Sequence, residues 1–183
     1  MRSLHILGSI LLLAACNRDI EKAKGILNTN ELNTDIAKDV TIFYSKDGDT
    51  KAKLATPVFK HMLKANPTYV EMPKGLVAHF YDENKNPTTK LTAKYGLLYE
   101  QTNNVLVRDS VVVSNIKNEK LETEELIWNE KLQRFFTDKF VKITTPTQII
   151  YGDGLESNQT FTSYKIMNVK GIIGIQKNQM PLP

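Results

Sequence analysis

The chain has 183 residues, of which 41% are apolar, and it carries 24 Lys and Arg against 20 Asp and Glu. This length predicts one domain or at most two, and the apolar fraction excludes a disordered chain. The single cysteine excludes an internal disulfide framework and a cysteine-rich zinc site, and a net charge of +4 does not by itself indicate a nucleic-acid partner.

The N-terminus has the pattern of an export signal. Arg2 supplies a positive charge, residues 6–13 are mostly apolar, and Ala14 and Ala15 directly precede Cys16. The run is shorter than the roughly 20 residues of a transmembrane helix, so residues 1–15 are predicted to be a signal peptide. The sequence at 13–16 also resembles the lipobox of bacterial lipoproteins, which implies lipid attachment at Cys16. The alternative is a plain signal peptide that happens to end at a cysteine.

The next segment is polar and the rest of the chain has a strand pattern. Residues 16–39 are predicted to be a lipid-anchored tether, which as a flexible coil would span roughly 26 Å. From Val40 onward, β-branched and aromatic runs alternate with turn residues, which is typical of strands. The runs lie at 40–45, 76–81, 91–99, 105–114, 121–128, 134–144, 148–151 and 160–169. We expect an all-β domain over residues 40–175, with one short helix at 58–65, and a flexible tail at 176–183.

A weak repeat runs through the strand region. Leu91, Leu121 and Ile150 begin similar segments, at spacings of 30 and then 29 residues. A period of this size predicts hairpin-like units that stack on one another and bury a continuous apolar face. The alternative is a coincidence among strands of similar length.

Alternating apolar residues assign an inner face to three segments. Successive side chains of a strand point to opposite sides, so residues in one phase share one face. Residues 121–128 and 140–145 are mixed, and no face is assigned to them. Taken singly, each assigned residue is an ordinary core position of a β-sandwich. The predicted inner-face residues are Leu76, Ala78, Phe80, Leu91, Ala93, Tyr95, Val105, Val107, Val111 and Val113.

Three segments within residues 45–169 resemble the LptC family of periplasmic lipopolysaccharide-export proteins, in its lipoprotein-anchored form. They read Leu91-Thr92-Ala93-Lys94-Tyr95-Gly96, Leu121-Glu122-Thr123-Glu124-Glu125-Leu126 and Tyr151-Gly152-Asp153-Gly154-Leu155-Glu156-Ser157. The resemblance implies a twisted, partly open β-jellyroll of two antiparallel sheets. It also implies that the inner-face residues line a groove for the acyl chains of lipopolysaccharide. Many members have an N-terminal transmembrane helix, where this chain has Cys16.

The resemblance further implies partners and a location. The family receives lipopolysaccharide from the inner-membrane ABC transporter LptB/LptF/LptG and passes it to the periplasmic bridge protein LptA. By analogy, Tyr164, Ile166 and Val169 form the edge that faces LptA, and the N-terminal strands face the transporter. The expected location is the periplasmic side of the envelope of a Gram-negative bacterium, with the lipid anchor in the inner membrane; the residue after Cys16 leaves an outer-membrane address open.

Other chemistry finds little support in the sequence. His5, His61 and His79 have no neighbours at the spacing of a metal site or a catalytic triad. We therefore expect no catalytic residue, no metal and no cofactor. Two other functions stay open: a structural or adhesive surface lipoprotein without lipid cargo, and, with the least support, an exported hydrolase.

Overall fold

The computed structural model describes residues 34–175, and this part of the chain contains strands and no helix. None of its elements is a helix long and apolar enough to cross a membrane. The strands are β1 (Thr34–Lys46), β2 (Asp49–Met62), β3 (Tyr69–Met72), β4 (Leu76–Tyr81), β5 (Pro87–Ala93), β6 (Tyr95–Tyr99), β7 (Asn104–Asn115), β8 (Lys120–Asn129), β9 (Arg134–Thr144), β10 (Gln148–Asn158) and β11 (Tyr164–Gly174).

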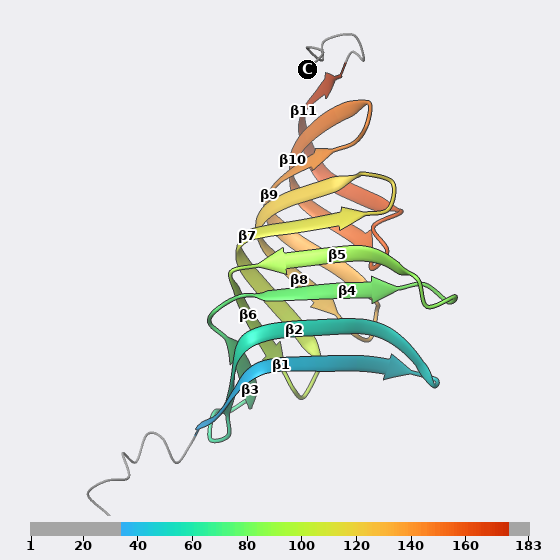
Figure 1. Ribbon diagram of the computed structural model, residues 1–183. Helices are drawn as coiled ribbons and strands as arrows, with labels where there is room; N and C mark the ends of the chain where they lie inside the picture. The colour runs from blue at the N-terminus through green and yellow to red at the C-terminus, as the bar shows by residue number, and fades with distance from the viewer. Residues whose placement is uncertain (1–33, 176–183) are drawn as a thin grey trace, which may run out of the picture. The chain divides into compact units, whose positions relative to one another are not determined.

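All eleven strands belong to one antiparallel sheet (Figure 1). Its order is β11-β10-β9-β8-β7-β5-β4-β2-β3-β6, with β1 paired to β2 and β6 also paired to β7. Within residues 34–175, β1 has β2 as its one neighbour and β11 has β10 as its one neighbour. The sheet therefore ends at these two strands, each with a free edge.

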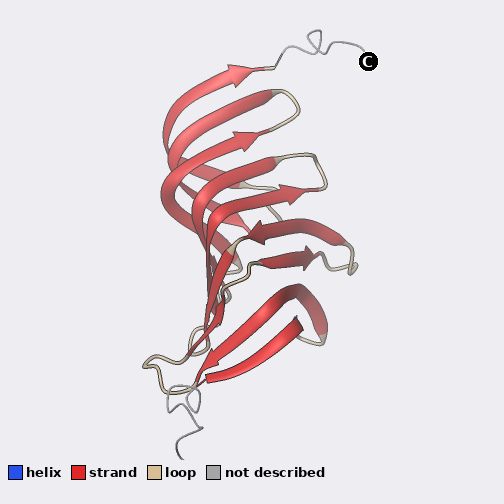
Figure 2. Ribbon diagram, turned by 60° about the vertical axis from the view of Figure 1, so that its left-hand side comes forward, coloured by secondary structure: helices blue, strands red, loops and turns tan. Residues whose placement is uncertain are grey.

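The long strands bend, and the sheet folds over on itself. The first half of β2 pairs with β4 and its second half with β3, while β7 pairs with β6 and then with β5. Left-handed backbone at Asp39, Asp109, Ser110 and Gly154 marks the bend in β1, β7 and β10. Register shifts accompany it, as expected of bulges that turn a strand sharply. Figure 2 shows the resulting two facing layers, so the expected jellyroll is confirmed, with both layers drawn from the same sheet.

A row of apolar residues crosses one of the two layers, from β1 at one end of the sheet to β11 at the other. Each member is the cross-strand partner of the next, and the central members are fully buried. The repeat positions Leu91, Leu121 and Ile150 all lie in this row, which explains their spacing. The row consists of Ile42, Leu54, Ala78, Leu91, Val113, Leu121, Ile143, Ile150 and Ile172.

Two expectations about the first part of the domain need correction. The helix expected at 58–65 is wrong, because β2 continues to Met62 and pairs there with both β1 and β3. A helix at this place would leave residues 34–38 of β1 and one edge of β3 without backbone partners, so the strand forms despite the flanking prolines. The first strand begins at Thr34, inside the expected tether, because residues 34–38 pair with the second half of β2. The expected signal peptide, Cys16, most of the tether and the tail at 176–183 lie outside the described residues.

Candidate functional site

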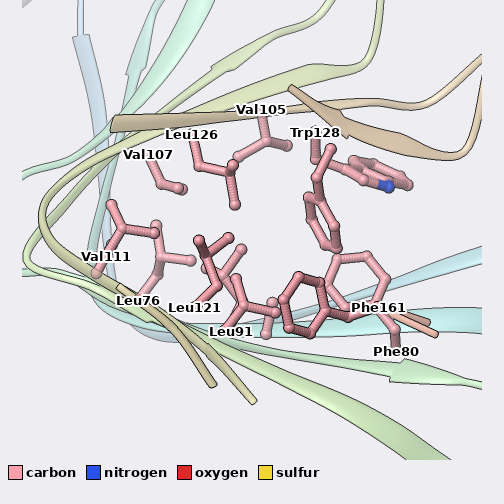
Figure 3. Packing of buried hydrophobic residues seen from close by; sticks show 14 of the residues in the cluster. Leu76, Phe80, Leu91, Val105, Val107, Val111, Leu121, Leu126, Trp128 and Phe161 are labelled. Atoms are coloured by element: carbon pink, nitrogen blue, oxygen red, sulfur yellow. The ribbon is translucent and has the colours of Figure 1, made fainter. Parts of the chain in front are cut away.

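The candidate site is an apolar pocket between the two layers, near the β1 end of the sheet. It has a volume of about 180 Å³ and opens to the surface. Figure 3 shows Val105, Val107 and Leu126 facing Leu76 and Leu91 across the interior. The lining residues are Ile42, Phe43, Tyr44, Ala52, Leu54, Leu76, Ala78, Phe80, Leu91, Leu98, Asn103, Val105, Val107 and Trp128.

Most of the predicted inner-face residues point into the space between the layers. Six of them line the pocket itself, namely Leu76, Ala78, Phe80, Leu91, Val105 and Val107. Ala93, Val111 and Val113 lie in the adjoining buried core, where no solvent reaches Val113. Alternation therefore located the interior correctly in β4, β5 and β7.

Tyr95 is the exception, because it lies away from the pocket and the core cluster. Its hydroxyl donates to Glu71 Oε1 at 2.9 Å, and the guanidinium of Arg108 lies 4.2 Å from its ring centre. Burial, followed by the Glu71 hydrogen bond, raises the pKa of the Tyr95 phenol. The alternation is interrupted at Lys94, where the chain passes from β5 in one layer to β6 in the other. Gly96 and Leu98 take the inward positions of β6 instead.

An aromatic cluster joins the two layers along their open edge, on the side away from the bend of the strands. The ring centre of Trp128 lies 5.4 Å from that of Tyr44 and 5.7 Å from that of Phe80, which lies 5.2 Å from that of Phe135. Tyr44 donates a hydrogen bond to Glu130. Burial, with a further contribution from that carboxylate, raises the pKa of Tyr44 to about 12. These contacts join β1 and β4 to β8 and β9 beside the pocket.

The loop between β10 and β11 covers the same open edge of the two layers, closer to the β11 end of the sheet. Phe161 at its tip is fully buried, and its ring stacks on Tyr164 at 5.1 Å. The Asn115 side chain at the end of β7 donates to the Phe161 carbonyl at 2.8 Å, and the Gln159 amide donates to the Gln133 carbonyl. The interior is therefore closed by side chains here and stays open at the pocket.

The chemistry of the pocket favours hydrocarbon. An apolar cavity of about 150 Å³ binds benzene in an engineered protein, so 180 Å³ accommodates a short length of one acyl chain. Among residues 34–175, no cluster of three His, Cys, Asp or Glu side chains is arranged to hold a metal ion. His61 is bonded to Glu100 at 2.9 Å near the surface. The site can bind an apolar group, and its lining provides no nucleophile with an adjacent base.

Both free edges of the sheet expose apolar side chains. On β1 these are Ile36 and Phe43; on and just after β11 they are Met167, Val169, Ile172, Ile173 and Ile175. The three residues expected at a partner edge all lie on β11. Tyr164 and Ile166 pack partly against the core, and Val169 is exposed. An open strand edge with exposed apolar residues is normally an aggregation risk unless another strand covers it.

Residues 4–173 match the family described as "Lipopolysaccharide-assembly, LptC-related". The chain belongs to this LptC family. The match spans nearly the whole chain and confirms the resemblance found in the three sequence segments. Membership connects the protein to lipopolysaccharide transport and assembly in the cell envelope. No curated protein matches the chain.

Proposed function

We propose that the protein is a non-enzymatic lipopolysaccharide-binding component of the export system. It receives the lipid from the inner-membrane ABC transporter LptB/LptF/LptG and passes it to LptA. The observation that carries the proposal is the apolar pocket between the layers, which opens to the surface in a member of the LptC family. Each methylene exposed to water costs about 0.8 kcal/mol, so a lipid with several acyl chains needs a continuous shield in an aqueous compartment.

The free edges support a relay between partners. A strand that pairs with β11 would extend the sheet by β-augmentation and cover the exposed Val169 and Ile172. The β1 edge would serve in the same way toward the transporter. In this arrangement LptA adds to β11, and the apolar interior continues from one protein into the next.

The N-terminus supports a location at the membrane. We propose that Cys16 carries the lipid anchor and that the anchor lies in the inner membrane. Two or more acyl chains give stable attachment where a single chain does not. In cells, Cys16→Ala should abolish labelling with a radioactive fatty acid and release the protein from the membrane fraction. Labelling that persists in this variant would contradict the assignment.

Photo-crosslinking from two adjacent leucines tests lipid binding. Leu98 lines the pocket, whereas Leu97 lies in the opposite phase of β6 and pairs with Leu106. A photoreactive amino acid at position 98 should form an adduct with lipopolysaccharide in cells, and the same substitution at 97 should not. Equal labelling at both positions, or none from position 98, would contradict the proposal and favour a structural lipoprotein without cargo.

The partner edge has its own test. Ile172→Asp places a charge on the exposed apolar face of β11, and Ile116→Asp places one at a somewhat more exposed position in the turn between β7 and β8. Capture of LptA should be lost in the first variant and kept in the second. If both variants capture LptA like the wild type, β11 is not the docking edge.

A further inference from the structure

The layer that carries the apolar row has lysines along its outward side. Each of them lies directly beside a buried residue in β2, β5, β8 or β9, so its own side chain points away from the interior. In β5, for example, Leu91 lines the pocket and Lys90 before it is exposed. We call this surface the lysine face, and its members are Lys51, Lys53, Lys90, Lys120 and Lys142.

The carboxylates on this side of the layer are too few to balance the lysines. Glu122 lies 2.8 Å from the Lys120 ammonium and 3.3 Å from that of Lys142, so one negative charge is shared by two positive ones. Asp49 lies 3.7 Å from the Lys51 ammonium at the start of β2. Five lysines therefore stand against two carboxylates, and the lysine face carries an excess of positive charge.

The excess is greatest over β2, β4 and β5. Lys53, His79 and Lys90 are successive cross-strand partners there, with no carboxylate between them. Within residues 34–175, neither Lys53 nor Lys90 forms an ion pair. The Lys53 ammonium instead lies 5.7 Å from the ring centre of Phe43, which is 59% exposed on the adjacent β1. This part of the face thus combines free positive charge with an exposed aromatic ring.

The outward side of the other layer is different, because its basic residues face acids. Lys60 lies 3.9 Å from Glu71, and Arg134 is paired with Glu156. Lys165 of β11 is also the cross-strand partner of Glu156. Positive charge is therefore concentrated on one of the two outward sides of the molecule.

We infer that the lysine face docks on a bilayer surface that contains anionic phospholipids. From Lys53 in β2 to Lys142 in β9 the face crosses five interstrand steps, about 24 Å, which is too wide for one phosphate group and suits an extended anionic surface. The exposed Phe43 ring adds apolar area to such a contact. The face lies outside the pocket and includes neither free edge of the sheet, so the inference goes beyond the proposed binding and transfer of lipopolysaccharide.

The position of the proposed anchor is compatible with this contact. Cys16 precedes Thr34, the first residue of β1, by 18 positions. A chain of that length spans at most roughly 60 Å when fully extended. A lipid on Cys16 would therefore keep the lysine face within reach of the headgroups.

Vesicle flotation tests the inference without the anchor. The chain from Cys16 onward contains all eleven strands, and when it is produced in the cytoplasm it carries no acyl group. It should float with vesicles of phosphatidylcholine that contain about 30% phosphatidylglycerol, and should stay behind with pure phosphatidylcholine. Sodium chloride at about 1 M, where the Debye length is about 3 Å, should release it. Equal binding to both kinds of vesicle, or to neither, would overturn the inference.

Single substitutions locate the contact. Lys53→Gln and Lys90→Gln should each weaken binding to the anionic vesicles about fivefold. Lys165→Gln removes the same charge from the other layer and should bind like the wild type. If all three variants lose affinity equally, the net charge and not the lysine face is responsible, and the inference fails.

Inorganic phosphate distinguishes a membrane surface from a site for a single phosphate group. At matched ionic strength, phosphate and chloride should release the chain from the anionic vesicles equally, because a broad surface contact responds to screening alone. Release by phosphate at concentrations where chloride has no effect would assign the lysines to individual phosphate groups and overturn docking on the bilayer.

Discussion

Gly152 controls how closely β11 packs on β10, and its substitution should loosen the exposed edge. The residue lies at a register shift between the two strands and pairs with Val169. A methyl group at Gly152 would lie 2.6 Å from the carbonyl oxygen of Asn168, a backbone atom that cannot rotate away, and would also overlap Ile166. Overpacking of this kind costs about 1–3 kcal/mol.

The cost should fall on β11 and not on the whole domain. This strand is held by one neighbour, so it can open locally while the rest of the sheet stays folded. In Gly152→Ala, hydrogen exchange of the β11 amides that bond to β10 should accelerate about 5- to 150-fold. Amides of β7 and β8 should exchange as in the wild type. Exchange measured by mass spectrometry on peptic fragments resolves the two regions.

Gly171→Ala is the matched control. Gly171 lies on β11 close to the same register shift, and a methyl group there would meet no atom within 4 Å. Its β11 amides should exchange at the wild-type rate or more slowly, because alanine reduces the freedom of the unfolded chain. Similar acceleration in both variants, or a uniform effect of Gly152→Ala on all strands, would refute the steric reasoning.

Three further predictions concern the core and the rim. Phe135→Ala removes a fully buried ring from the aromatic cluster and should lower the free energy of unfolding by about 3–5 kcal/mol in urea titrations. Thr56→Val removes the donor to the buried Gly75 carbonyl at 2.8 Å and should cost about 1–3 kcal/mol in the same assay; an unchanged midpoint would contradict the role of that bond. The pKa of Tyr44 is about 12 in the folded protein against 10 unfolded, so the folded state retains the proton between these values and its stability falls as pH rises from 10 to 12. Tyr44→Phe should lose less stability over this interval than the wild type, and equal losses would rule out Tyr44 as the group responsible.

The sequence was sufficient to identify the fold and six of the fourteen residues that line the pocket, because alternation is a local property. Leu76, Ala78 and Phe80 alternate cleanly along β4, and the structure buries all three. Alternation failed where the backbone bends. In β8, the register shift between Thr123 and Ile127 changes the phase, so Leu126 points inward, which explains the mixed pattern there.

The rest of the pocket depends on contacts between distant parts of the chain. Tyr44 and Trp128 are 84 residues apart in sequence, and their rings meet because the second half of β1 and the second half of β8 lie in facing layers. No spacing in the sequence predicts that pair. Tyr95 was misplaced for a related reason, since nothing local indicates that Lys94 separates two layers.

The apolar row that runs from Ile42 to Ile172 also restricts the register of any strand that pairs with β11. Its nine members are separated by eight interstrand steps of about 4.8 Å, so it extends about 38 Å across the strands. An added strand that places an inward-facing apolar residue opposite Ile172 lengthens the row by one step. A shift of one residue in that pairing turns every side chain of the added strand to the other face and ends the row at Ile172. Whether the apolar row continues from one protein into the next therefore depends on whether the register of the added strand is shifted by an even or an odd number of residues.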